Sequence, residues 1–289
     1  MRGARLIGDT VLAVADGGSQ QIRFFLRDGE LLGVGGRAGA GPAEFSGLSS
    51  IHPYRPGTIL AWDFRLRKAA VFDDRGNFLD SWRVRGHGDE HLAPVGGAVD
   101  GTVFLHSSHP IQPSSPPRVS RPSVALLRLP PHGDNADTVG VFEGPERYHG
   151  PGMAVARVRF TTSTVFAVRD ESIITANTAT TEIKVWDTAG HLRRSVRWTQ
   201  PSYDVLPRHI AAEKQRLKED IGPLVLLARS RQMFEDPTEH LTENMPFPTV
   251  FPSYAPYPLM STGTSGWRRI NAPATPIPHG SLFTPMVRR

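Results

Sequence analysis

Three side chains that can bind a metal ion lie within five consecutive residues of this 289-residue chain. His87, Asp89 and His91 belong to the segment His-Gly-Asp-Glu-His, and imidazole nitrogens together with a carboxylate form common transition-metal sites. The segment is a glycine-flanked loop, whereas the paired histidines of a zinc-protease motif lie on one helix that points both rings at one ion. We therefore expect a solvated loop between structural elements, and keep His87, Asp89 and His91 only as weak candidate metal ligands.

Nucleophilic chemistry has less support. The chain has no cysteine and no Gly-x-Ser-x-Gly segment, which is the turn that exposes the serine of many hydrolases. Adjacent acids such as Asp73-Asp74 fall where turns are expected, and aspartate is common in turns for backbone reasons. The other histidines of interest are scattered around Pro- and Gly-rich segments: His106, His109, His132 and His149. The sequence thus indicates no catalytic residue and no cofactor site.

A repeat explains the recurring acidic position better than catalysis does. An Asp or Asn precedes a Gly by thirteen residues three times, as Asp16–Gly29, Asp63–Gly76 and Asn177–Gly190. Apolar residues occupy matching columns between them, for example Phe24, Val71 and Val185. Alternating apolar runs separated by a polar turn and a turn glycine predict a β-hairpin module. A position that recurs in several modules indicates turn chemistry, because a catalytic residue is needed once.

The modules set the expected architecture, which is an all-β repeat fold with a short helical insertion. Four sheets are expected near residues 5–33, 47–84, 95–143 and 151–198, with a remnant at 245–260. The prolines of segment 109–123 predict a surface loop that interrupts the third module. Apolar residues at helical spacing predict an insertion at 207–235. Because Pro207 and Pro223 both suit the first turn of a helix, two short helices are expected there.

The net charge of +5 does not indicate a nucleic-acid partner. The region after Asn244 holds four arginines and no acid: Arg268, Arg269, Arg288 and Arg289. Without them, 29 basic residues face 28 acidic ones, which is not the electrostatic footprint of a nucleic-acid-binding domain. No window approaches the roughly 18 uninterrupted apolar residues of a membrane span. We expect no nucleic acid and no membrane span.

These columns resemble the six-bladed β-propellers of the NHL-repeat-like superfamily, most clearly in Thr58–Gly76 and Ser172–Gly190. The segment Gly-Arg-Ala-Gly-Ala-Gly-Pro-Ala-Glu-Phe at 36–45 resembles the G-x-x-G-x-G-P-G-E-F junction of a bacterial, uncharacterised subfamily. Ala43 departs from that pattern, which has a glycine there. The resemblance covers about 5–200 well and 201–260 loosely. It implies a propeller of the six-bladed type, in a subfamily that is mostly secreted or periplasmic, although no signal peptide is visible here.

Two competing motif interpretations, WD repeats and a phosphate loop, are excluded by where their residues lie in the sequence pattern. Trp62-Asp63 and Trp186-Asp187 look like WD repeats, but the first pair ends the first strand of its hairpin and the second pair ends the second strand. The glycines of the junction do not form a phosphate loop, because Pro42 and another β module follow where a helix N-terminus is required. We expect the junction to be a linker between blades.

The repeat pattern stops after the fourth module, so the sequence predicts an incomplete propeller of about four clear blades plus a remnant. Residues 261–289 have no periodicity, no acid and many prolines, which predicts disorder. A frame-shifted reading of this tail would restore a blade motif. An open ring would expose strand edges and apolar blade faces, and poor solubility or partial order of the isolated chain is expected.

The function that follows from the resemblance is non-catalytic binding or scaffolding. A protein or small-molecule ligand, of unknown identity, is expected at the channel mouth or on inter-blade loops, where irregular segments carry specificity. One alternative is a metal-dependent propeller hydrolase or lyase, although no column of Glu, Asn, Asp and His reproduces its ligand set. Another is a non-functional, truncated gene product. The compartment remains open.

Overall fold

The computed structural model describes residues 2–85, 91–110, 112–152, 154–230, 236–253, 255–258 and 265–268. Four sheets follow one another along the chain, and each is a four-stranded antiparallel meander. Blade 1 contains β1 (Gly3–Ile7), β2 (Val11–Asp16), β3 (Gln21–Leu26) and β4 (Leu31–Gly35). Blade 2 contains β7 (Leu48–Pro53), β8 (Thr58–Asp63), β9 (Lys68–Asp73) and β10 (Phe78–Arg83). Blade 3 contains β11 (His91–Gly97), β12 (Val103–Ser108), β14 (Ser123–Leu129) and β15 (Asp137–Glu143). Blade 4 contains β18 (Thr164–Arg169), β19 (Ser172–Asn177), β20 (Glu182–Asp187) and β21 (Leu192–Arg197).

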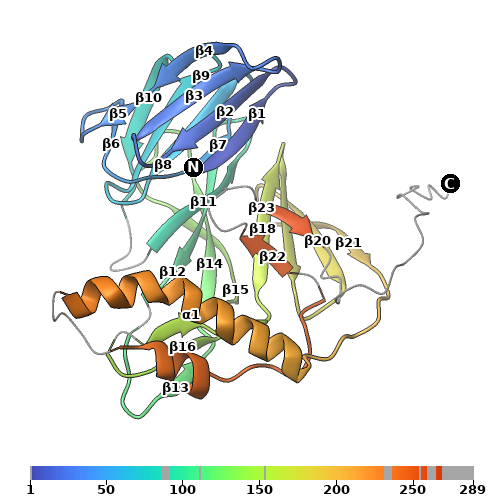
Figure 1. The fold of residues 1–289 in the computed structure, drawn as a ribbon. Helices are drawn as coiled ribbons and strands as arrows, with labels where there is room; N and C mark the ends of the chain where they lie inside the picture. Colours follow the sequence, from blue (N-terminus) through green and yellow to red (C-terminus); the bar gives the residue numbers. More distant parts are fainter. Residues whose placement is uncertain are drawn as a thin grey trace.

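The first strands of successive blades lie next to each other. Strand β1 contacts β7, β7 contacts β11, and β11 contacts β18, while the fourth strands lie at the outer edges of their sheets. Figure 1 shows blades 1 and 2 stacked at the top and the strands of blades 3 and 4 below them. Meander sheets joined in series around their first strands are propeller blades. The described residues therefore form an all-β fold built of β-propeller blades, as the repeat predicts.

Each pair of neighbouring blades buries its own apolar core. Phe24 of blade 1 packs with Ile59 and Phe72 of blade 2. Trp62 of blade 2 packs with Leu105 of blade 3 in a second cluster. A third cluster joins blades 3 and 4, and it contains Phe104, Leu126, Ile173 and Trp186. Strands β8 and β9 are buried along almost their whole length because both faces of blade 2 meet a neighbouring blade, whereas β2 of blade 1 alternates buried with more accessible residues.

The repeated glycine lies in the turn before the fourth strand of its blade. Gly29, Gly76 and Gly190 have φ angles of 94°, 87° and 91°, a left-handed conformation that glycine adopts at the lowest cost. The two Trp-Asp pairs lie on different strands, since Asp63 ends β8 and Asp187 ends β20. The hairpin interpretation and the rejection of WD repeats are both confirmed.

The glycine-rich junction is a linker between blades 1 and 2, as expected. It carries only a short parallel pair, β5 (Arg37–Ala38) with β6 (Glu44–Phe45). Its first glycine, Gly36, has φ 79° and lies against the ring of Phe45, where an added Cβ would come within 2.5 Å of the ring. No helix follows the glycines, so the segment is not a phosphate loop.

The interruption of blade 3 is more ordered than a surface loop. It contributes β13 (Arg118–Ser120), which pairs with β16 (Arg147–His149), and β16 pairs with β17 (Val155–Arg157). Blade 4 consequently begins at Thr164, later than the expected start near 151, because β17 belongs to this separate three-stranded sheet. The proline-rich sequence gave no periodicity long enough to predict these three-residue strands.

The expectation of two short helices is wrong. Helix α1 (Pro207–Ser230) is continuous, and the short π-helix η1 (His240–Asn244) follows it. Leu217 and Ile221 of α1 pack on Tyr148 of the three-stranded sheet, and Figure 1 shows α1 (orange) crossing this region near β16 and β13. Tertiary packing of an apolar face stabilises a helix more than local propensity does, and it outweighs the hydrogen bond that Pro223 cannot donate.

The last described elements are β22 (Ala255–Pro258) and β23 (Ser265–Arg268), which pair with each other. Strand β22 lies in the expected remnant, and β23 lies in the segment for which no regular structure was expected. Residues 259–264 and 269–289 lie outside the described part of the chain.

Candidate functional site

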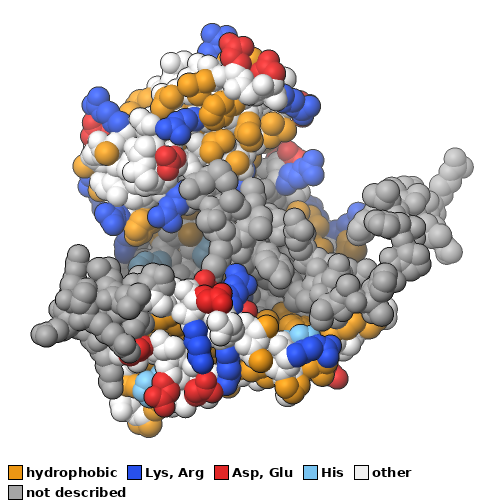
Figure 2. All heavy atoms as spheres, in the orientation of Figure 1, with side chains coloured by type: hydrophobic (Ala, Val, Ile, Leu, Met, Phe, Trp, Pro, Cys, Tyr) orange, Lys and Arg blue, Asp and Glu red, His pale blue; other side chains and the backbone are white. Residues whose placement is uncertain are grey.

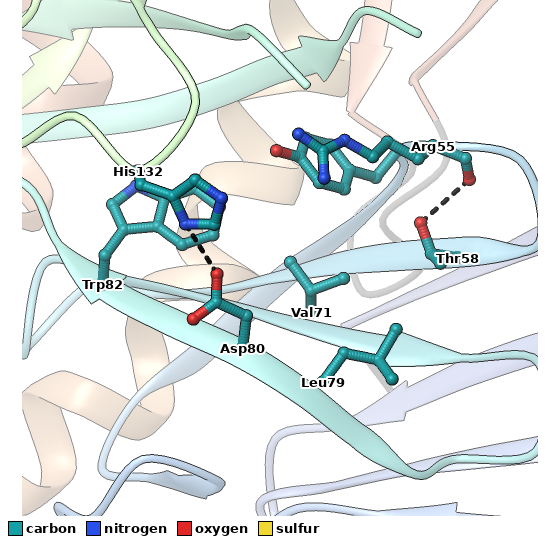
Figure 3. A pocket seen from close by; sticks show the side chains of 8 residues that line it. Arg55, Thr58, Val71, Leu79, Asp80, Trp82 and His132 are labelled. Atoms are coloured by element: carbon teal, nitrogen blue, oxygen red, sulfur yellow. Dashed lines mark hydrogen bonds and ion pairs between the residues drawn. The ribbon is translucent and has the colours of Figure 1, made fainter. Parts of the chain in front are cut away.

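A pocket opens between blades 2 and 3 (Figure 3). Its volume is about 140 Å³, several times the roughly 30 Å³ that one water occupies in the liquid. Blade 2 provides most of the wall, with residues from its β7–β8 turn and from β8, β9 and β10, and blade 3 provides one residue from its β14–β15 turn. The lining residues are Tyr54, Arg55, Thr58, Val71, Leu79, Asp80, Trp82 and His132.

A β-bulge in β10 places one wall of the pocket. Phe78 pairs with Phe72 and Asp80 pairs with Val71, so Leu79 is an extra residue on the edge strand. A bulge bends its strand and redirects side chains, and bulges are frequent beside functional sites. Leu79 is 52% exposed, which makes it an unusually accessible apolar side chain on this wall.

The opposite wall is fixed by contacts across the blade interface. His132 Nδ1 lies 2.8 Å from Asp80 Oδ2, and its ring centroid lies 5.7 Å from that of Trp82. Figure 3 shows the imidazole over the indole, with Asp80 below it. His132 also has φ 56°, a left-handed conformation that is uncommon outside glycine. Such backbone strain persists only where the surroundings fix it, and it clusters at ligand-binding sites.

Tyr54 makes the floor rigid. Its hydroxyl donates a 2.6 Å hydrogen bond to the Gly101 carbonyl of blade 3, and its ring lies 6.3 Å from that of Trp82. Burial raises the pKa of Tyr54 above its ordinary value, with opposing influence from Arg55, so the phenol is neutral at physiological pH. The Arg55 guanidinium lies 5.4 Å from the Tyr54 ring centroid, a cation–π geometry that leaves its N–H groups at the rim.

This arrangement is suited to binding an apolar group with polar contacts at its edge. Val71, Leu79 and Trp82 give apolar walls, whereas Arg55 and the Asp80–His132 pair give charge at the rim. The Asp80–His132 pair resembles the orienting half of a catalytic triad. However, Thr58 Oγ1 donates to the Arg55 carbonyl at 2.8 Å, and among the described residues no hydroxyl donates to His132.

Trp82 carries a further sign of a specialised site. Its indole Nε1 is buried and has no hydrogen-bond partner within the described chain. An unpaired buried donor costs about 1–3 kcal/mol, and each such group in a native structure needs an explanation. Trp82 lies between Tyr54 and His132, with tilted ring pairs at interplanar angles of 42° and 55°, and these contacts hold the indole in its orientation.

Two of the three sequence-based metal candidates, His87 and Asp89, lie outside the described residues. His91 is the exposed first residue of β11, paired with Ser108. Within the described ranges, no group of three or more His, Asp or Glu side chains is arranged to hold a metal ion.

Sequence reasoning missed the pocket. His132 was expected on a solvated loop, and no spacing rule connects it with Asp80, since the two come from different blades. His132 does lie in a turn, but His106 and His149 lie in strands and not in loops. His106 belongs to β12 and stacks on Phe166, and His149 belongs to β16. The bulge at Leu79 had no signal in the sequence.

The repeated acidic column is turn chemistry, as predicted. Asp16 accepts from Gly18 N at 2.9 Å, and Asn177 Oδ1 accepts from Ala179 N at 2.9 Å. Asp63 Oδ1 accepts from Arg65 N at 2.9 Å. A side-chain oxygen that accepts a backbone N–H two residues later is an Asx turn.

No protein-family model and no curated protein sequence matches the chain. Among solved structures, it is similar to a DUF4221 family member from Bacteroides vulgatus, with 8% identity and a TM-score of 0.44 over 71% of this chain and 59% of that one. It is also similar to BamB from Moraxella catarrhalis, with 11% identity and a TM-score of 0.32 over 71% and 66% of the two chains. A third similar structure is virginiamycin B lyase from Staphylococcus aureus, with 8% identity and a TM-score of 0.36 over 69% of this chain and 70% of that one. At these values the likenesses carry no functional argument, and the propeller fold rests on the sheet topology above.

The chain thus spans about 59% of the length of the first of these proteins. Within the described residues, no helix has the length and apolar character needed to cross a membrane.

Proposed function

We propose that this chain is a non-catalytic binding module of the six-bladed, NHL-like propeller type, and that it binds an apolar side chain of a partner protein in the pocket between blades 2 and 3. The observation that carries the proposal is the apolar lining formed by Val71, Leu79 and Trp82. It is open to solvent at Leu79, and the Asp80–His132 pair at the rim fixes it across the blade interface.

The energetics suit this ligand class. Burying one Leu- or Phe-sized side chain contributes about 1.5–3 kcal/mol, and a preformed pocket adds little ordering cost. Arg55 and Asp80 at the rim can then pair with backbone or charged groups on either side of the anchor. An extended peptide with one apolar anchor fits both features.

A random peptide library displayed on phage tests the proposal. We expect selected peptides to share one large apolar residue and to lose at least tenfold in affinity for the Leu79→Glu variant. The matched control is Leu31→Glu, since Leu31 is equally exposed, at 51%, on the outer strand of blade 1. Selected peptides that bind Leu79→Glu and the unmodified protein equally would refute the pocket as the site.

The metal-dependent alternative is tested on the same protein by melting it with and without calcium, magnesium and zinc ions. A saturable rise in Tm that is lost in His91→Ala would favour the hydrolase or lyase. An unchanged Tm with all three ions would favour the binding module.

A further inference from the structure

The three-stranded sheet of β13, β16 and β17 has two chemically different faces. Tyr148 and Ala156 lie on the face that packs on Leu217 of α1. Arg147 and Arg157 alternate with them along β16 and β17, and they are directly opposite each other in the register. Side chains of directly opposed residues lie on the same face, so two guanidinium groups share the face away from α1.

This arrangement is unfavourable without a counter-charge, because like charges opposite each other destabilise a sheet. Burial lowers the pKa of Arg157 below its ordinary value, and repulsion from Arg159 and Arg147 lowers it further. Burial also lowers the pKa of Arg147. Two further arginines nearby do have acidic partners: Arg159 lies 3.1 Å from Glu213, and Arg121 lies 2.9 Å from Glu146.

Arg147 and Arg157 keep most of their donor capacity. Arg147 donates to the His109 carbonyl, and Arg157 Nη2 donates to Ser163 Oγ at 3.0 Å. A guanidinium has five N–H donors and no acceptor. Among the described residues, no carboxylate forms an ion pair with either one, so this face carries two uncompensated positive charges.

Arg147 is nearly buried, at 9% exposure, whereas Arg157 is accessible at the surface although its guanidinium is partly desolvated. A ligand can therefore approach from the Arg157 side. Ser163 is buried, and its backbone N donates to Thr178 Oγ1, which fixes the backbone at Ser163.

We propose that Arg147 and Arg157, with Ser163, bind a doubly charged oxyanion of the phosphate type. Two guanidinium groups match its charge, and their planar N–H forks match its oxygens better than ammonium groups would. The anion is either free inorganic phosphate or the phosphate of a small phosphorylated ligand. This site is separate from the pocket between blades 2 and 3.

The test is calorimetric titration of the protein with sodium phosphate at constant ionic strength, with sodium chloride as the blank. We expect saturable phosphate binding, and at least a tenfold weaker affinity in Arg157→Gln. The matched control is Arg194→Gln, because Arg194 is an exposed arginine on β21 and its loss should leave the affinity unchanged. A second titration with glycerol 3-phosphate separates the sources: tighter binding assigns a phosphorylated ligand, and equal or weaker binding assigns free phosphate.

A stability measurement guards against misfolding of the variant. Without phosphate, Arg157→Gln should melt at the same temperature as the unmodified protein or higher, because one of the opposed charges is gone. With phosphate, only the unmodified protein and Arg194→Gln should gain in Tm. Absent phosphate binding, or equal binding by Arg157→Gln and the unmodified protein, would overturn the proposal.

Discussion

Asp63 and Lys68 face each other in register across the β8–β9 turn, and both reach out of blade 2 to hold the linker that follows blade 1. Asp63 Oδ2 accepts from Ser46 N at 2.6 Å and from Gly47 N at 3.1 Å. The Lys68 ammonium donates to the carbonyls of Gly41, Pro42 and Glu44. One side chain therefore satisfies the amide groups of the linker and the other its carbonyl groups.

Asp63→Asn should destabilise the fold by about 3 kcal/mol, because the amide nitrogen would face backbone N–H groups that need an acceptor, and bonds to a charged group are worth about 1.5–3 kcal/mol. Asp16→Asn is the matched control. Asp16 occupies the same repeat column, but its carboxylate accepts hydrogen bonds only within its own turn. Asp16→Asn should therefore reduce stability much less than Asp63→Asn. Urea denaturation measures both, and equal losses would contradict the linker role of Asp63.

Lys68→Met keeps the volume of the side chain and removes its charge. Lys68 is 3% exposed, so three linker carbonyls would lose their donor, and we expect a loss of about 2–3 kcal/mol. Lys68→Arg should recover part of it, because it restores donors in a longer side chain. Hydrogen exchange should locate the increased opening in residues 36–47, and an unchanged exchange pattern there would contradict this account.

His52 should make the fold sensitive to acid. Burial lowers the pKa of His52 from 6.5 to about 3, with a further lowering from Arg5 and then His106, while a hydrogen bond to Val95 opposes them. The unfolded chain binds a proton more readily than the folded one between these values. The stability that neutral His52 gives the folded state is thus fully present above about pH 6.5 and is lost as the pH falls toward 3.

The slope expected from His52 is at most about 1.4 kcal/mol per pH unit. Urea denaturation at a series of pH values should show stability falling on acidification, and His52→Gln should flatten the curve within this window. Parallel curves for the two proteins would show that His52 does not carry the effect.

Self-association should originate on the outer face of blade 1. Leu6, Leu12, Phe25 and Leu31 pair in register across all four of its strands, and the exposed members are Leu6 at 41%, Leu12 at 38% and Leu31 at 51%. Figure 2 shows apolar side chains gathered over this blade. Exposed apolar patches of this kind favour association.

We expect the double change Leu6→Ser and Leu12→Ser to lower the association seen in sedimentation velocity over a concentration series. An unmodified protein that sediments as one monomer at every concentration, and melts in a single sharp transition, would contradict this prediction.

The fold could be predicted where the repeat was regular. Phe24 and Val71 occupy the same apolar column of the repeat. Gly76 lies in the repeated glycine column and adopts the left-handed turn conformation that this column indicates. Elements with short or conflicting local signals could not be predicted. Strand β17 has three residues, and α1 continues past Pro223 because packing outweighs propensity.

The candidate sites were less predictable still, because both depend on long-range pairing. Asp80 and His132 meet only when blades 2 and 3 pack, and Arg147 and Arg157 are opposed only when β16 pairs with β17. No sequence spacing rule predicts either pair. The strand registers and blade contacts that bring these residues together arise only in the tertiary structure.

Binding in the pocket between blades 2 and 3 is tested most directly by the affinity of one selected peptide, measured by fluorescence polarisation against the unmodified protein, Leu79→Glu and Leu31→Glu. We expect at least a tenfold loss for Leu79→Glu, equivalent to about 1.4 kcal/mol, and no change for Leu31→Glu. Equal affinity for all three proteins, or a loss confined to Leu31→Glu, would contradict binding in the pocket between blades 2 and 3.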